Sequence, residues 1–199
     1  MTRSNEPVAS GRWRTIDIVV AAVLAVAFGV VFWAWGLVWA AAEPAFLALP
    51  PARYLISGVW LMPAVLGALV IRRPGAALFT ELLAAIVASF LGSQWGLDTL
   101  LSGFAQGAAA ELVFAFTLYR AWSLPVAILA GTAAAVGEWI HDMPLYFPET
   151  AFEVQLLYGL FMLISGALIA GGGSWLLVRS LAQTGVLEPF ASGRSQRAV

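Results

Sequence analysis

The sequence predicts an all-α membrane protein in which six helices cross the bilayer, and three observations lead to this fold class. Of the 199 residues, 61% are hydrophobic and only 11% are charged, whereas soluble domains carry about 25% charged residues. Six apolar stretches approach or exceed the roughly 20 residues that a helix needs to span a bilayer. The basic residues also gather on alternate connections between these stretches, as they do in membrane bundles.

The first three predicted helices occupy the N-terminal half of the chain. The first covers about 18–41 and follows Asp17, which we expect to cap it. The second and third cover about 54–71 and 75–91. The short connection between them ends in Pro74, which predicts a tight turn with proline at the helix start, where its missing N–H costs nothing.

The last three predicted helices cover about 103–119, 124–140 and 154–178, and the fifth begins through Pro125. The third and fifth lie near the lower length limit for a span. We therefore divide the chain into a cytoplasmic N-terminal segment (1–16), a six-helix transmembrane domain (17–180) and a polar cytoplasmic C-terminal tail (181–199).

The arginines predict that both termini lie in the cytoplasm. All ten basic residues are arginine. With both termini inside, nine of them fall in inner segments and only Arg53 in an outer one, as the positive-inside rule requires. The outer connections, about 42–53, 92–102 and 141–153, are acidic and longer than the inner ones. This bulk favours a binding site that opens outward.

The composition excludes several kinds of chemistry. Lysine is absent, which rules out a Walker A loop and a Schiff-base lysine. Cysteine is also absent and His141 is the single histidine, so we expect no metal site, no cofactor and no catalytic residue. The net charge of −1 argues against a nucleic-acid partner. The apolar composition predicts that the protein is surrounded by the lipid bilayer.

Three glutamates, Glu81, Glu111 and Glu138, lie inside predicted spans. A charged group at that depth costs about 2.5–3.5 kcal/mol on insertion scales, so it usually faces the protein interior and has a function. Hydrogen bonding to a nearby serine or backbone carbonyl is the structural alternative. Glu111 is expected about two turns below the outer end of its helix, while Gln106 points about 140° away around the same helix.

Six of the nine tryptophans fall in the outer half of the predicted bundle: Trp33, Trp35, Trp39, Trp60, Trp95 and Trp139. An interfacial aromatic belt would explain some of them, but Trp60 lies about 10 Å below the outer surface by helix rise. Tryptophan walls with buried acids suit a flat, nitrogen-rich and cationic ligand, which rings can stack on and carboxyl groups can hydrogen-bond.

Small residues recur at four-residue spacing in the first helix, at Ala21, Ala25 and Gly29. Such a stripe allows another helix to approach closely. The pattern leaves open whether that helix belongs to this chain or to a partner.

Several segments together resemble the substrate-binding S-components of energy-coupling factor (ECF) vitamin transporters, of the YkoE type for thiamin or its hydroxymethylpyrimidine precursor. The most specific are Arg72-Arg-Pro-Gly-Ala-Ala77 and Gln106-Gly-Ala-Ala-Ala-Glu111. Others are Gly58-Val-Trp60, Glu81-Leu-Leu-Ala-Ala85, Ser165-Gly-Ala-Leu-Ile-Ala-Gly171 and Leu181-Ala-Gln-Thr-Gly-Val-Leu187. They extend from the second helix to the tail, so the likeness covers most of the chain.

The resemblance implies a multi-pass subunit of a bacterial plasma membrane that binds one vitamin in an outward-facing pocket. Its partners would be a transmembrane T-component and two cytoplasmic ATPases, and the whole subunit would topple to release its cargo. The docking stripe maps onto Ala21 and Ala25. The ligand-facing acids map onto Glu81 and Glu111, with Gln106 and Trp60 beside them.

Four further residues are candidates for the ligand site because they are buried acids or outer aromatic residues: Glu138, Trp139, Trp35 and Trp39. The chain begins Met-Thr, whereas S-components for nickel and cobalt begin with a Met-His motif, which argues against a metal cargo. Three alternatives stay open: an S-component for another heterocyclic vitamin, a proton-coupled secondary carrier and an intramembrane enzyme. The sequence shows no internal repeats, which are common in secondary carriers. It also lacks cysteine and lysine and has a single histidine, so most side chains used in enzyme catalysis are missing.

Overall fold

The computed structural model describes residues 12–193, and within this range it is all-helical, with no strand. Five helical stretches are long and apolar enough to cross a membrane, and α3 is a sixth, shorter apolar helix. The chain is thus a multi-pass membrane protein. Its elements are α1 (Thr15–Ala42), η1 (Glu43–Phe46), η2 (Pro50–Val59), α2 (Met62–Ile71), α3 (Ala76–Phe90), α4 (Asp98–Phe116), α5 (Leu124–Tyr146), α6 (Phe152–Ser165), η3 (Gly166–Gly173) and α7 (Ser174–Gln183).

The second span is broken rather than continuous. Residues of η2 form a 3-10 helix, and the α-helix α2 begins only at Met62. Pro63 stands in the first turn of α2, where a proline is well tolerated because that N–H has no partner inside the helix. The α2–α3 turn places Arg72 in the left-handed region with φ 54°. The tight turn predicted there is confirmed, but Pro74 is not at the helix start, because α3 begins at Ala76 with Gly75 as its N-cap.

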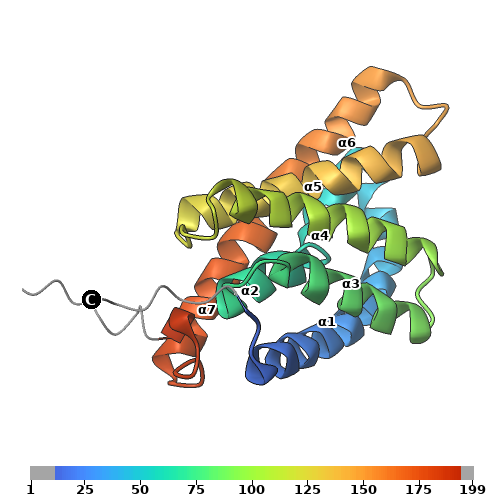
Figure 1. Ribbon diagram of the computed structural model, residues 1–199. Coiled ribbons are helices and arrows are strands. Elements are labelled where there is room, and N and C mark those ends of the chain that lie inside the picture. The colour runs from blue at the N-terminus through green and yellow to red at the C-terminus, as the bar shows by residue number, and fades with distance from the viewer. Residues whose placement is uncertain (1–11, 194–199) are drawn as a thin grey trace, which may run out of the picture.

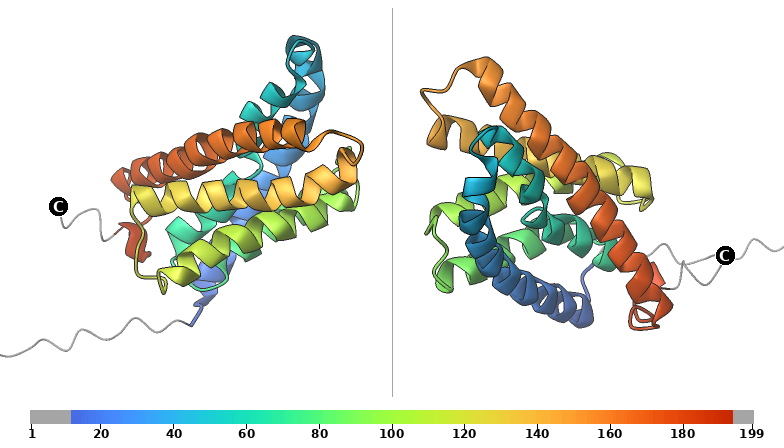
Figure 2. Two further views of the ribbon diagram at one scale, coloured as in Figure 1. Left: turned by 90° about the horizontal axis from the view of Figure 1, so that it is seen from above. Right: turned by 180° about the vertical axis from the view of Figure 1, so that it is seen from behind.

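The sixth span runs without interruption through α6, η3 and α7, and η3 has π-helical geometry. Glycines let α5 approach it closely. A Cβ built on Gly131 would lie 2.2 Å from the carbonyl oxygen of Gly166, far inside contact distance. Figure 2 (left) shows α4, α5 and this long helix side by side, with α1 crossing them steeply.

Three expected boundaries prove to be wrong. Helix α4 begins at Asp98 rather than near 103, and α5 continues to Tyr146 rather than ending near 140. Asp17 is not the N-cap of α1: it lies in the first turn and accepts a hydrogen bond from the N–H of Arg14, which is the N-cap. These shifts change the depth of every acid on α4 and α5.

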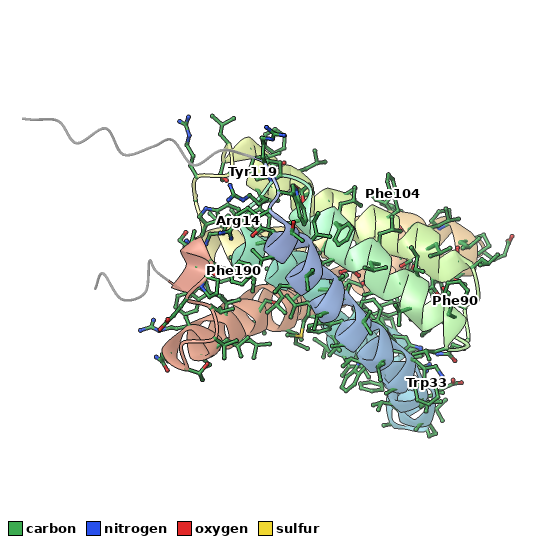
Figure 3. All side chains as sticks on the ribbon, turned by 60° about the horizontal axis from the view of Figure 1, so that its bottom comes forward. Arg14, Trp33, Phe90, Phe104, Tyr119 and Phe190 are labelled. Carbon is green, nitrogen blue, oxygen red and sulfur yellow. The ribbon has the colours of Figure 1, made fainter. Side chains whose placement is uncertain are left out.

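Ion pairs hold together one end of the bundle. This end contains Arg14, Arg72 and Arg73 and is hereafter called the arginine end. The guanidinium of Arg14 contacts Asp17 at 2.6 Å, and that of Arg73 contacts it at 3.4 Å. Figure 3 shows Arg14 near Tyr119 and Phe190, and Trp33 and Phe90 at the opposite end.

The polar tail predicted from residue 181 onward is partly a folded element. Helix α7 continues to Gln183, and Leu187 and Phe190 are buried beyond it. The hydroxyl of Ser192 donates to the carbonyl of Val70 at 3.0 Å. The expected N-terminal segment lies outside the described residues except for 12–16, as does the tail beyond 193.

The stripe of small residues on α1 packs inside the molecule. Ala21 and Ala25 are fully buried, and a Cβ on Gly29 would lie 2.4 Å from the Cβ of Val87 on α3. Figure 1 shows α1 and α3 as neighbours. In this structure the expected docking stripe is therefore not exposed: Ala21 is buried, and α3 of the same chain packs on Ala25 and Gly29.

Candidate functional site

A cavity of about 360 Å³ opens at the end of the bundle opposite the arginine end. This volume lies within the range of about 300–1,000 Å³ that small-molecule sites occupy. Its walls come from α1, η1, η2, α3, α4, α5 and α6, so residues far apart in the sequence meet around it. The aromatic lining residues are Phe32, Trp39, Phe46, Tyr54, Trp60, Trp95, Tyr146, Phe147 and Tyr158.

The tryptophans of the cavity form a connected chain of edge-to-face contacts. The ring centroids of Trp39 and Trp60 lie 5.2 Å apart, and those of Trp60 and Trp95 lie 5.1 Å apart. Tyr54 extends this chain, with its centroid 5.1 Å from that of Trp39. Edge-to-face packing fixes ring orientation, so the cavity presents a rigid aromatic wall.

Four acidic residues also line the cavity: Glu43, Asp98, Glu138 and Asp142. Arg53 is the basic residue of the lining, and it is already occupied. Its guanidinium pairs with Glu43 at 3.3 Å, donates to the carbonyl of Trp39 and lies 4.2 Å from the Trp39 ring centroid. The other three acids have no basic partner among the residues that line the cavity.

Glu138 is the deepest of these acids and is 4% exposed. Because α5 continues to Tyr146, Glu138 lies eight residues, or about 12 Å, before the end of its helix. The hydroxyl of Ser57 donates to its Oε2 at 3.3 Å. One hydrogen bond leaves most of its acceptor capacity free for a ligand.

The carboxylates nearer the mouth belong to a network that joins α4 to α5. His141 contacts Asp142 through Nδ1 at 2.9 Å and Asp98 through Nε2 at 3.2 Å. The hydroxyl of Tyr146 donates to Asp98, and that of Tyr54 donates to Asp142 at 3.4 Å. The mouth of the cavity is thus built from side chains on three elements.

Of the residues predicted for the site, the structure brings four together at the cavity: Trp39, Trp60, Gln106 and Glu138. Gln106 is 4% exposed, and its amide donates to the hydroxyl of Ser102 at 2.6 Å. The other four do not line it. Trp35 and Trp139 use their indole N–H groups to donate to backbone carbonyls, Ile56 and Gln155 respectively, each at 2.8 Å.

Glu111 lies near the arginine end, where its side chain caps the N-terminus of α3. Its carboxylate accepts hydrogen bonds from the N–H groups of Gly75 at 2.6 Å, Ala77 at 2.8 Å and Leu78 at 3.3 Å. The expectation that Glu111 faces the ligand is wrong in this structure, because α4 starts earlier than predicted and carries Glu111 about 20 Å from the helix start. Partial burial and a hydrogen bond to Glu111 raise the pKa of Tyr119 to about 12.

Glu81 is also withdrawn from the cavity. It is fully buried between helices, and its Oε2 accepts the N–H of Ala64 at 2.8 Å, in the first turn of α2. Its other oxygen, Oε1, has no hydrogen-bond partner among the described residues. Glu81 thus supports the break in the second span instead of contacting a ligand.

The sequence reasoning missed the residues at the ends of helices. Tyr54, Asp98, Asp142, Tyr146 and Tyr158 all line the cavity but fell in or beside predicted connections. Asp142 carried one usable signal, since it lies one helical turn after Glu138 and shares its face. Among the described residues, no group of three or more histidine, aspartate or glutamate side chains is placed to hold a metal ion.

Comparison with known proteins supports a single family. Residues 16–137 match the family described as the permease component of an ABC-type cobalt transport system. A putative HMP/thiamine permease protein, YkoE from Bacillus subtilis (strain 168), is 38% identical over 92% of this chain and 91% of its own. The crystal structure of an S-component of an ECF transporter superposes with a TM-score of 0.88, at 35% identity over 94% of both chains.

Proposed function

Because the chain belongs to the YkoE-type S-components of ECF transporters, we propose that it binds thiamin or its hydroxymethylpyrimidine precursor in the aromatic cavity. Its relative is named for that pair of ligands. The observation that carries the proposal is the lining itself, in which buried carboxylates stand beside a wall of edge-packed indoles. Thiamin offers two flat rings, one with a permanent positive charge and one with an amino group.

Each part of the lining has a role in this proposal. Trp39, Trp60 and Trp95 supply ring faces and edges for stacking and cation–π contact. Glu138 accepts from the amino group or pairs with the cationic ring, and the Gln106 amide offers both a donor and an acceptor. Electrostatic interactions are stronger at buried positions such as Glu138 than in bulk water, because the effective dielectric there is lower.

We further propose that the chain is the substrate-specific, non-catalytic subunit of an ATP-driven importer. The family implies a transmembrane T-component and two ATPase subunits as partners. The sequence contains no lysine and so no Walker A motif, which assigns ATP hydrolysis to other chains. The arginine end would face the cytoplasm under the positive-inside rule, and the cavity would then open outward.

Ligand retention tests the assignment directly. The protein is purified in mild detergent without added vitamin, and the bound molecule is released and identified by mass spectrometry. We expect thiamin or the pyrimidine precursor at close to one molecule per chain. Recovery of a different heterocycle, or no saturable quenching of tryptophan fluorescence by either compound, would refute the proposal.

A further inference from the structure

His141 stands behind two carboxylates of the cavity mouth and outside the lining itself. Both of its ring nitrogens face an oxygen of an acid, Asp142 on its own helix and Asp98 on α4. The side chain of His141 is 13% exposed, and those of Asp98 and Asp142 are 21% and 12% exposed. The imidazole is therefore held by charged groups that a ligand would meet directly.

The hydrogen-bond chemistry gives this arrangement two states. A carboxylate can only accept, and a neutral imidazole has a single N–H, so the neutral ring satisfies one of its two partners. The imidazolium donates to both. With the ring charged, His141 and its two carboxylates carry a net charge of −1, and with the ring neutral they carry −2.

The other titratable groups that face this cluster are few. Tyr146 donates to Asp98, and its ring centroid lies 6.5 Å from that of His141. Tyr54 donates to Asp142 from η2, and Glu138 lies one helical turn earlier on α5. None of these supplies a positive charge. Imidazole is the group whose charge ordinarily changes between pH 5 and 8.

We propose that His141 is a positioning residue that sets the net charge of the cavity mouth and thereby decides how strongly the site prefers a cationic ligand over a neutral one. The inference rests on the proposed function. It concerns selectivity within the site, since a unit of negative charge attracts the thiazolium of thiamin but has no net charge to act on in the pyrimidine precursor.

Two variants fix the charge permanently. His141→Gln stays neutral, and His141→Arg stays positive while keeping donors for both acids. Dissociation constants for thiamin and for the pyrimidine precursor are measured by tryptophan quenching at pH 8. We expect selectivity for thiamin to be about tenfold higher in His141→Gln than in His141→Arg, a difference worth about 1.4 kcal/mol. Selectivity is the ratio of the two dissociation constants measured in the same variant, so a general weakening of the site cancels.

A pH series on the wild type gives a second readout that a purely structural role would not move. As the pH is raised through the range in which imidazole loses its charge, the selectivity of the wild type should rise toward that of His141→Gln, while both variants stay level. Equal selectivity in the two variants, or variants that follow pH as the wild type does, would overturn the proposal. If the wild type binds neither compound, the proposed function itself fails, and that outcome is distinct from a lost difference in selectivity.

Discussion

Glu138 is the acid on which the proposed site depends most, and replacing it by glutamine isolates its charge. Glutamine has the same shape and can still accept the hydrogen bond from Ser57. Glutamine cannot carry a negative charge, so the variant cannot form an ion pair with a cationic ring at this position, which is 4% exposed. Hydrogen bonds to charged groups contribute about 1.5–3 kcal/mol net, and about 1.4 kcal/mol corresponds to one decade in dissociation constant. We therefore expect thiamin binding to weaken about ten- to a hundredfold.

The assay uses the protein's own fluorescence, because Trp39, Trp60 and Trp95 line the same cavity. Glu43→Gln is the matched control. Glu43 also lines the cavity, but its side chain is 64% exposed and paired with Arg53, and exposed ion pairs contribute about 0–1 kcal/mol. Binding should change by less than about fivefold in that variant. A folded Glu138→Gln protein that titrates like the wild type would show that this carboxylate does not contact the ligand.

Three further outcomes follow from the fold. Glu111→Ala should lower the free energy of unfolding by about 1–3 kcal/mol, since three N–H groups lose their acceptor. The same variant should leave the thiamin dissociation constant unchanged, and a stable variant that loses thiamin binding would contradict this prediction. Ala25→Trp should prevent folding or strongly lower the melting temperature, because Ala25 is fully buried in the molecule; normal stability with normal binding would contradict the packing of α1 on α3. In intact cells, an impermeant maleimide should label Glu149→Cys and spare Thr184→Cys, and the reverse pattern would invert the proposed orientation.

The number of helices could be predicted from the sequence because each apolar stretch carries its own signal of length and composition. Their ends could not, because polar residues such as Asp98 and Asp142 lie inside helices here. A shift of five residues at the start of α4 moves Glu111 by about 7.5 Å along the axis. Because of that shift, Glu111 contacts the start of α3 instead of the expected ligand.

Side-chain direction around a helix was more predictable than depth along it. Gln106 and Glu111 lie on different sides of α4, and the structure puts only Gln106 at the cavity. The stripe on α1 shows the opposite case, since Ala21, Ala25 and Gly29 do share one face and do meet a helix closely. The spacing of small residues cannot say which helix that is, because α3 and a partner subunit would require the same shape.

Glu81 and Glu111 together show a second reason for an acid inside a membrane span. Each accepts N–H groups in the first turn of another helix, Glu81 at α2 and Glu111 at α3. The first N–H groups of a helix have no partner within it, and water that could satisfy them is scarce inside a bilayer. A carboxylate both accepts these hydrogen bonds and offsets the positive end of the helix dipole. An acid predicted inside a membrane span should therefore be assigned to a ligand only after nearby helix starts have been considered. A broken span such as η2–α2 places such a helix start in the middle of the bundle.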